Sequence, residues 1–127
     1  MVLDTHIWLW WASDLRRLST PLRSRLRRAR DLVISAMSVW EVAMLVEKGR
    51  LRFAMDTRLA IDRLLGIDRL RVAPVGETVA REAALLGSSF HGDPCDRIIV
   101  ATAIELGMPL LTMDERILES GLVTTYS

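Results

Sequence analysis

Short runs of β-forming residues alternate with longer stretches of helical periodicity along the chain. The β-type runs fall at residues 2–4, 32–35, 70–74, 109–112 and 122–125. Strands separated by helices are typical of a parallel sheet with helices packed on its faces. The sequence therefore predicts an α/β fold. At 127 residues the chain can bury one sizeable core but not two, so we expect residues 1–127 to form one domain.

Capping residues and apolar spacing indicate where the helices lie. A core helix is expected over the apolar run from residue 7, and longer helices over residues 21–29, 38–48, 58–65, 79–86 and 94–106. Thr20 stands before Pro21 as an N-cap would, and Gly49 follows the helix from residue 38, where a left-handed residue is common. The apolar face of residues 58–65 is expected to include Leu59, and that of residues 79–86 to include Ala80 and Leu86.

The last long helix is expected to be buried on every side. Asp93 and Pro94 open it, Gly107 closes it, and the residues from Ile98 onward are apolar around the whole circumference. Asp96 therefore lies at the edge of a core. A carboxylate in that position either caps the helix or takes part in chemistry.

Composition excludes several classes of protein. The longest uninterrupted apolar stretches, residues 7–12 and 98–101, fall short of the ~20 residues of a membrane-spanning helix. The first residues include Asp4 and His6 and lack a basic leader, so no secretory signal is expected. A single cysteine, Cys95, allows no internal disulfide and fits a reducing cytoplasm.

Four acidic residues are predicted to meet at one edge of the sheet. Asp4 and Asp114 follow strands, whereas Glu41 and Asp96 lie in the first turns of helices. In a parallel α/β sheet the carboxyl ends of strands and the amino ends of helices share one edge, where sites form. Asp4 separates a core strand from a core helix, which is an unusual place for an acid.

The other acids also have purely structural interpretations. Ser38 and Glu41 match a capping box, in which each side chain satisfies a backbone amide of the other residue. Asp93 fits an N-cap with Asp96 in the favourable first turn, and Asp114 fits the cap of a short helix. Both interpretations stay open for these acids.

Electrostatic repulsion limits what such a group of acids can do. Two carboxylates about 5 Å apart repel by about 3 kcal/mol at an effective dielectric of about 20. Converging acids must therefore take up protons or hold a cation. Oxygen ligands, two histidines and one cysteine favour Mg²⁺ or Mn²⁺ over zinc. Carboxylate-bound ions of this kind commonly act on phosphate esters.

Four motifs occur in a characteristic order along the chain. They are Asp4-Thr5-His6, Ser38-Val39-Trp40-Glu41, Asp93-Pro94-Cys95-Asp96-Arg97 and Thr112-Met113-Asp114-Glu115. Together they resemble the PIN-domain ribonucleases, especially the VapC-type toxins of bacterial toxin–antitoxin pairs, over nearly the whole chain. The resemblance implies a three-layer α/β/α domain with a central parallel sheet, a Mg²⁺ or Mn²⁺ cofactor and cleavage of single-stranded or structured RNA. It also implies a cognate antitoxin and a homodimer.

The resemblance implies roles for individual residues. The catalytic and metal-binding positions are Asp4, Glu41, Asp96 and Asp114, with Asp93 as a further metal ligand, and the supporting positions are Thr5, Ser38, Thr112 and Arg97. Two departures from the family pattern stand out. Only three residues precede Asp4, which implies a short first strand or a trimmed start, and Cys95 stands where an aromatic residue is commoner.

These residues predict metal-dependent hydrolysis of an RNA phosphodiester. Asp4 and Asp96 are expected to ligate the main ion, Glu41 to ligate it or orient the attacking water, and Asp114 with Asp93 to complete a second or weaker site. The alternative is a catalytically silent PIN-like module that binds RNA or protein. A receiver-type signalling domain is disfavoured because it needs a lysine at a strand end, and the only lysine ends a helix.

A basic segment and four tryptophans offer further binding surfaces. Arg23, Arg27 and Arg30 are expected on one helix face, where they either contact RNA phosphates or face solvent. The tryptophans are predicted either to form a groove for an antitoxin segment or to pack in the core; they are Trp8, Trp10, Trp11 and Trp40. His6 is expected to pack or bind beside the site. A thiol dyad of His91 and Cys95 is disfavoured because no third orienting group is evident.

Overall fold

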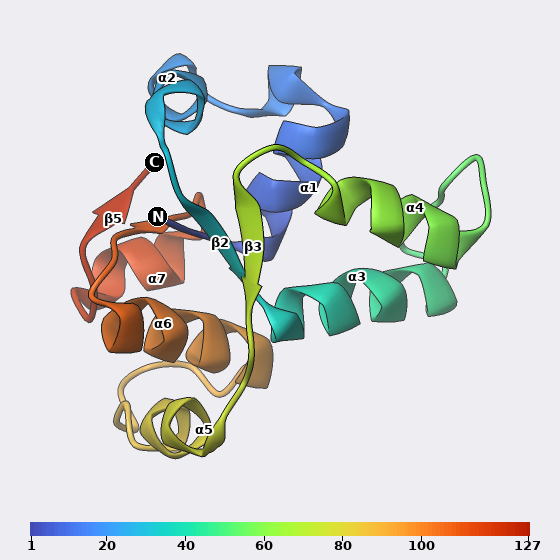
Figure 1. The fold of residues 1–127 in the computed structure, drawn as a ribbon. Helices are drawn as coiled ribbons and strands as arrows, with labels where there is room; N and C mark the ends of the chain where they lie inside the picture. Colours follow the sequence, from blue (N-terminus) through green and yellow to red (C-terminus); the bar gives the residue numbers. More distant parts are fainter.

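A computed structural model describes residues 1–127 and contains one five-stranded sheet (Figure 1). The strands are β1 (Val2–Leu3), β2 (Leu32–Ser35), β3 (Leu70–Ala73), β4 (Leu110–Leu111) and β5 (Thr125–Tyr126). All neighbouring pairs are parallel, and the strand order is β3-β2-β1-β4-β5. The order changes direction between β1 and β4, and such a switch point is where open α/β sheets bind ligands.

Helices cover both faces of the sheet (Figure 1). One face carries α1 (Thr5–Ser13), α2 (Thr20–Arg28), α3 (Ala36–Glu47) and α4 (Thr57–Leu65), and the other carries α6 (Pro94–Leu106) and α7 (Glu115–Ser120). A 3₁₀ turn, η1 (Leu15–Arg17), joins α1 to α2, and α5 (Glu77–Ala84) packs against the outside of α6. The predicted three-layer α/β/α fold is therefore confirmed. None of the helices has the length and apolarity needed to span a membrane.

The two cores are supplied by alternate residues of the same strands. Leu3 and Leu111 belong to the core under α1 to α4, whereas Val2 and Leu110 belong to the core under α6 and α7. Successive side chains of a strand point to opposite faces, so each residue of β1 and β4 is buried on one side of the sheet or the other. This arrangement fixes the register of β1 and β4, and hence the positions of the polar residues that follow them.

Some predicted boundaries were wrong. Ser19, not Thr20, caps α2, because the Ser19 hydroxyl accepts the Leu22 amide hydrogen bond (3.3 Å). In α5, Ala80 is exposed and Leu86 lies beyond the end of the helix. The fifth strand lies at Thr125–Tyr126 rather than at residues 122–125. Leu122 and Val123, which precede this strand, pack against the core under α6 and α7, and only Thr125 and Tyr126 pair with β4.

Two helices bury a narrower face than predicted. Leu59 of α4 is 48% exposed, because the helix packs through Ala60, Ile61 and Leu64. In α6, Ile104 is 45% exposed, so the helix is not buried on every side. The predicted C-terminal ends of α3 and α6 are confirmed. Gly49 and Gly107 both adopt the left-handed conformation (φ 70° and 63°) that ends a helix.

Candidate active site

The C-terminal edge of the sheet carries all five acidic residues of the predicted site. Asp4 follows β1 and Asp114 follows β4, the two strands at the switch point. Asp93 and Asp96 begin α6, and Glu41 lies on α3. Burial and then the charges of the other four acids raise the pKa of Asp96, so all five interact electrostatically. The structure thus brings the whole predicted set together.

Asp4 is held in place by two hydrogen bonds. It is only 6% exposed; its Oδ1 accepts from the Thr5 amide (2.8 Å) and its Oδ2 from the Thr112 hydroxyl (2.7 Å). The Thr112 hydroxyl also accepts from the Asp114 amide (3.0 Å), which connects the end of β4 to Asp4. Burial raises the pKa of Asp4, and the bonds from Thr112 and Thr5 act against that rise without cancelling it.

The capping box predicted for Ser38 and Glu41 was wrong. Ser35 caps α3 by accepting a hydrogen bond from the Met37 amide (3.0 Å), which places Glu41 in the second turn. Ser38 is buried inside the helix and accepts a hydrogen bond from the Thr5 hydroxyl (2.9 Å). Burial is the main cause that raises the pKa of Glu41, and the charge of Asp4 adds to it. No backbone amide donates a hydrogen bond to the Glu41 carboxylate, so Glu41 does not cap α3.

Asp96 is the least satisfied acid at this edge. It is almost fully buried, and no hydrogen bond in the structure ends on its carboxylate; burial and its neighbours raise its pKa to about 7. Nε2 of His91 lies 3.2 Å from Asp96 Oδ2, without the direction of a hydrogen bond. Nδ1 of His91 accepts a hydrogen bond from the Asp93 amide (3.4 Å), which ties this ring to the start of α6.

Asp93 and Asp114 are helix caps, as the structural interpretation predicted. Oδ1 of Asp93 accepts from the Cys95 and Asp96 amides (2.9 and 3.3 Å). Oδ1 of Asp114 accepts from the amides of Arg116 and Ile117 (2.9 and 3.3 Å). Burial acts to raise the pKa of Asp114, but these bonds outweigh it and hold the pKa below its usual value. Capping occupies Oδ1 of each carboxylate. Oδ2 of Asp114 lies 3.5 Å from the Arg116 guanidinium, whereas no hydrogen bond or ion pair ends on Oδ2 of Asp93.

The chemistry of this donor set fits a hard divalent cation. Carboxylate and hydroxyl oxygens are the ligands that Mg²⁺ and Mn²⁺ prefer. A cation would offset the burial and repulsion that raise the pKa values of Asp96 and Glu41. No three His, Cys, Asp or Glu side chains are already positioned to hold a metal ion. Binding one therefore requires these side chains to turn toward a common point.

Arg97, predicted to support the site, does not face the acids. Its guanidinium donates hydrogen bonds to the carbonyl oxygens of Ala83, Ala84, Gly87, Phe90 and His91 (2.7 to 3.4 Å). These carbonyls belong to the end of α5 and to the segment that leads into α6. Arg97 therefore positions the chain that carries His91 and Asp93, and its effect on the site is indirect.

The thiol dyad is excluded by the surroundings of Cys95. The side chain is buried, and burial together with the nearby acids raises the pKa of the thiol to about 12. A thiol with such a pKa does not form the nucleophilic thiolate near neutral pH. Nε2 of His91 lies 3.2 Å from Asp96 Oδ2, and no hydrogen bond joins His91 to the Cys95 thiol.

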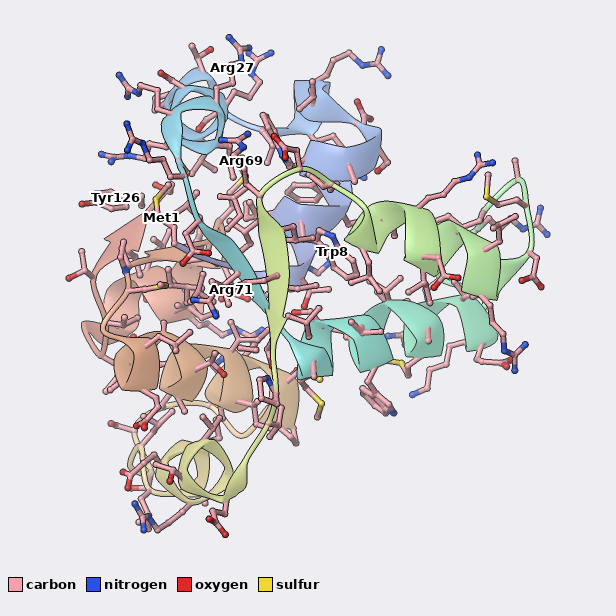
Figure 2. All side chains as sticks on the ribbon, in the orientation of Figure 1. Met1, Trp8, Arg27, Arg69, Arg71 and Tyr126 are labelled. Atoms are coloured by element: carbon pink, nitrogen blue, oxygen red, sulfur yellow. The ribbon has the colours of Figure 1, made fainter.

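The four tryptophans do not form one groove. Trp8 is fully buried beside α4, where its Nε1 donates a hydrogen bond to the Leu64 carbonyl oxygen (3.0 Å; Figure 2). Trp40 is 55% exposed, and Trp10 and Trp11 pack partly buried against the core under α1. Trp8 is thus a core residue, and the groove prediction was wrong for it.

The arginines predicted to bind RNA lie far from the acids. α2 leads into the start of β2, and Arg69, which precedes β3, donates a hydrogen bond to the Arg27 carbonyl oxygen (3.2 Å; Figure 2). Arg27 and Arg69 therefore lie at the N-terminal edge of the sheet. Arg30 lies beyond the end of α2, so it does not share a helix face with Arg23 and Arg27.

Two of the acids, Asp4 and Asp114, line a cleft that the sequence analysis did not identify. The cleft has a volume of about 370 Å³, and its lining includes Asp4, His6, Trp10, Arg17, Arg50 and Asp114. His6 and Trp10 are four residues apart and share a face of α1, which their spacing could have indicated. Arg17 and Arg50 come from η1 and from the segment after α3. Only folding brings those segments together.

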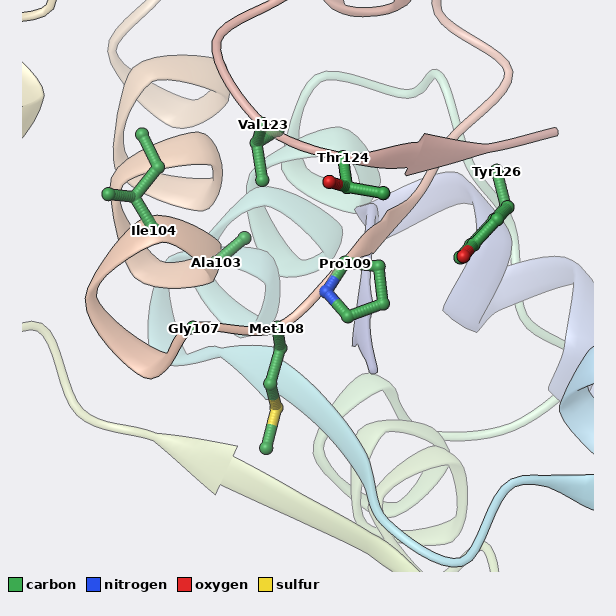
Figure 3. A pocket seen from close by; sticks show the side chains of 8 residues that line it. All are labelled: Ala103, Ile104, Gly107, Met108, Pro109, Val123, Thr124 and Tyr126. Carbon is green, nitrogen blue, oxygen red and sulfur yellow. The ribbon is translucent and has the colours of Figure 1, made fainter.

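A second cavity lies at the opposite end of α6 (Figure 3). It has a volume of about 360 Å³ and lies between the C-terminal end of α6 and the segment that contains β5, with Ile104, Met108, Val123 and Tyr126 among its lining. Ala103 and Ile104, which line this cavity, are seven and eight residues after Asp96 on α6, about 11 to 12 Å along the helix axis. Its lining contains no acidic residue, so it is separate from the candidate active site.

Comparisons with known proteins agree with this architecture. The PIN domain family model matches residues 1–121. Ribonuclease VapC22 of Mycobacterium tuberculosis is 37% identical over 117 residues, which cover 92% of this chain and 88% of that protein. VapC20 of the same species, a toxin that cleaves the sarcin-ricin loop, has a TM-score of 0.69 at 16% identity and covers 96% of this chain and 95% of its own. A toxin–antitoxin complex from Klebsiella pneumoniae has a TM-score of 0.65 at 17% identity, with 99% of this chain and 95% of that chain covered. The chain belongs to the PIN-domain family.

Proposed function

We propose that this chain is an endoribonuclease that acts as the toxin of a toxin–antitoxin pair. The observation that carries the proposal is the group of five interacting acids at the C-terminal edge of the sheet. The similarity to ribonuclease VapC22 supports the activity, and the toxin–antitoxin complex with the same fold supports an antitoxin partner. The proposed substrate is single-stranded or structured RNA. The proposed working form is a cytoplasmic homodimer.

Asp4, Glu41 and Asp96 are the proposed ligands of a Mg²⁺ or Mn²⁺ ion. Asp93 and Asp114 contribute to a second or weaker site through their Oδ2 atoms, which for Asp114 requires the Arg116 guanidinium (3.5 Å away) to move aside. When bound, such an ion lowers the pKa of a water molecule and offsets the charge that develops on the phosphate oxygens. No side-chain nucleophile is required, which agrees with the raised pKa of the Cys95 thiol.

The remaining residues of the site hold the acids in place. The Thr112 hydroxyl and the Thr5 amide fix the two oxygens of Asp4, and Ser38 fixes the Thr5 side chain.

Glu41, whose pKa is raised by burial, orients the attacking water and accepts its proton. The water oxygen bonds to phosphorus as the bond from phosphorus to the leaving ribose oxygen breaks.

RNA cleavage in the presence and absence of metal tests this proposal. Purified protein should cleave single-stranded RNA with Mg²⁺ or Mn²⁺ and should stop on addition of EDTA. Asp4→Asn should lose this activity. Glu105→Gln is the matched control, because Glu105 is an exposed acid near the other end of α6.

Two results would contradict the proposal. Cleavage by Asp4→Asn at the wild-type rate would remove the assignment of Asp4. A wild-type protein that binds RNA in Mn²⁺ but leaves it intact would be the silent binding module, the alternative that the sequence left open.

A further inference from the structure

The cleft beside the acids combines two kinds of group that recognise nucleic acid. Asp4 and Asp114 line it, and His6 and Trp10 extend it along α1. Trp10 lies six residues after Asp4, about 9 Å along the helix. A stacked strand rises 3.4 Å per nucleotide and an extended one rises more, so about 9 Å is within the reach of the first nucleotides beside one bound at Asp4. Because Asp4, Asp114 and Trp10 line the same cleft, a strand bound at these two acids can reach Trp10.

Two arginines in this cleft have no acidic partner. Arg17 and Arg50 are both exposed and make no ion pair, whereas the adjacent Arg16 pairs with Asp14 (3.1 Å). The Arg17 guanidinium instead lies 4.6 Å from the centroid of the Trp10 ring. Unpaired guanidinium groups are well suited to phosphate, which they can bind through two parallel hydrogen bonds.

Planar groups lie next to these cations. The His6 and Trp10 rings are 5.5 Å apart and tilted by 49°, and His6 is exposed. Proteins that read single-stranded RNA stack unpaired bases on aromatic rings and on guanidinium planes. A paired base within a duplex hides both of its faces, so stacking of this kind selects single strands.

We propose that this cleft binds one nucleotide of single-stranded RNA next to the phosphodiester that is cut. Arg17 and Arg50 contact its phosphates, and its base stacks against Trp10 and His6. The inference rests on the proposed ribonuclease function, because it takes the acids as the point of cleavage. It assigns substrate binding to residues outside the acidic cluster, of which Arg17 and Arg50 also lie outside the four sequence motifs.

Binding can be measured apart from cleavage. Fluorescence anisotropy in EDTA with a short single-stranded oligoribonucleotide reports RNA affinity while hydrolysis is prevented. Arg17→Gln and Arg50→Gln should each weaken binding by about fivefold or more. Each should also reduce the slope of log affinity against log salt by about 0.7, the value for one lost phosphate contact on a single strand. Arg16→Gln and Arg52→Gln remove the same charge from neighbouring exposed positions and should change neither quantity.

A second comparison tests the stacking. Trp10→Leu should weaken binding of the intact oligonucleotide by about fivefold or more. This loss of affinity should be smaller for an oligonucleotide that lacks bases. The arginine variants should weaken binding of the intact and the abasic oligonucleotide equally. Circular dichroism of Trp10→Leu checks that the fold is retained, and Trp10→Phe should restore most of the affinity. Double-stranded RNA of the same sequence should bind more weakly than the single strand.

The two proposals fail in different ways. If Arg17→Gln and Arg50→Gln match their controls in RNA affinity and in KM, the cleft proposal is wrong even if the enzyme is active. If the protein never cleaves RNA but loses affinity in these variants, the ribonuclease proposal is wrong and the cleft still binds RNA. Variants that keep full RNA affinity but no longer bind a purified antitoxin would assign the cleft to the protein partner and would also overturn the inference.

Discussion

Asp114 and Asp96 stand at the same edge of the sheet, but their surroundings differ. Asp114 caps α7 through two amide hydrogen bonds, which hold its pKa below the usual value. Asp96 lies in the first turn of α6, receives no hydrogen bond and has a pKa raised to about 7. Asp114 stabilises its own helix, whereas the ionised form of Asp96 destabilises the folded state. Such a cost in stability is expected where an acid serves a site rather than the structure.

The largest expected effect of this difference is on cleavage. Asp96→Asn should lower the rate of RNA cleavage by at least about a hundredfold, because it removes a charge proposed to hold the ion. Asp114→Asn should lower it by only about tenfold, because Asp114 is proposed for the weaker site. Single-turnover cleavage at saturating Mn²⁺ measures both rates. Equal losses would remove the functional distinction between the two acids.

Stability without metal should depend on pH through Asp96. An aspartate has a pKa of about 3.9 in the unfolded chain, and burial with neighbouring charges raises that of folded Asp96 to about 7. A raised pKa contributes stability that is full below about pH 4 and is lost as the pH rises through about 7. The raised pKa values of Asp4 and Glu41 act in the same direction. Urea unfolding in EDTA should therefore show a less stable protein at about pH 8 than at about pH 5.

Asp96→Asn should reduce this pH dependence and raise stability in EDTA at about pH 8 by about 1 to 3 kcal/mol, since it removes the repulsion among the acids. The wild-type Asp114 cap is the internal comparison, because its lowered pKa gives stability that is lost only in acid. A variant that is less stable than the wild type at about pH 8 would mean that Asp96 supports the fold.

Arg97→Lys should have a smaller effect, of about 1 to 2 kcal/mol on unfolding, because an ammonium cannot replace five guanidinium contacts. Amide exchange should also quicken in residues 87–93, the segment that carries His91 and Asp93. Arg81→Lys is the matched control, because Arg81 is exposed and pairs only with the adjacent Glu82 (3.0 Å). Unchanged exchange in that segment would show that Arg97 does not position it.

The smallest expected effect concerns the Asp114 cap. Asp114→Ala should destabilise the protein by about 1 kcal/mol, and Asp114→Asn should restore most of the loss, since asparagine also caps helices well. Thermal unfolding in EDTA compares the two variants. If asparagine fails to restore stability, the charge of Asp114 matters more than its hydrogen bonds, and the contrast with Asp96 weakens.

Short-range sequence patterns predicted the helix caps at this site well. Asp93 with Pro94 and Asp114 are caps that short-range patterns identify, and Gly107 ends α6 where its left-handed conformation is needed. The alternation of strands and helices along the chain likewise indicated a parallel sheet. These features depend on residues within one or two turns of each other, so they can be read without knowing the fold.

The rest of the site depends on contacts between distant segments. Ser35 and Ser38 both lie near the start of the same helix, and spacing alone could not decide which of them caps it. The decision rests on the Thr5 hydroxyl, 33 residues away from Ser38, which binds Ser38 inside the helix. The same limit applies to Arg17 and Arg50, which meet Asp4 only after folding. The sequence therefore located the acids but not the cleft beside them.

Titration with Mn²⁺ tests the central claim most directly. The claim is that the acids at the C-terminal edge form a cluster that is destabilised until a divalent cation binds. Calorimetry at about pH 8 should show that the wild-type protein binds Mn²⁺, and thermal unfolding should shift upward as binding to the folded state requires. Asp96→Asn should lose most of the binding and of the shift. A wild-type protein that neither binds Mn²⁺ nor gains stability, or an Asp96→Asn variant that binds it equally well, would contradict the account.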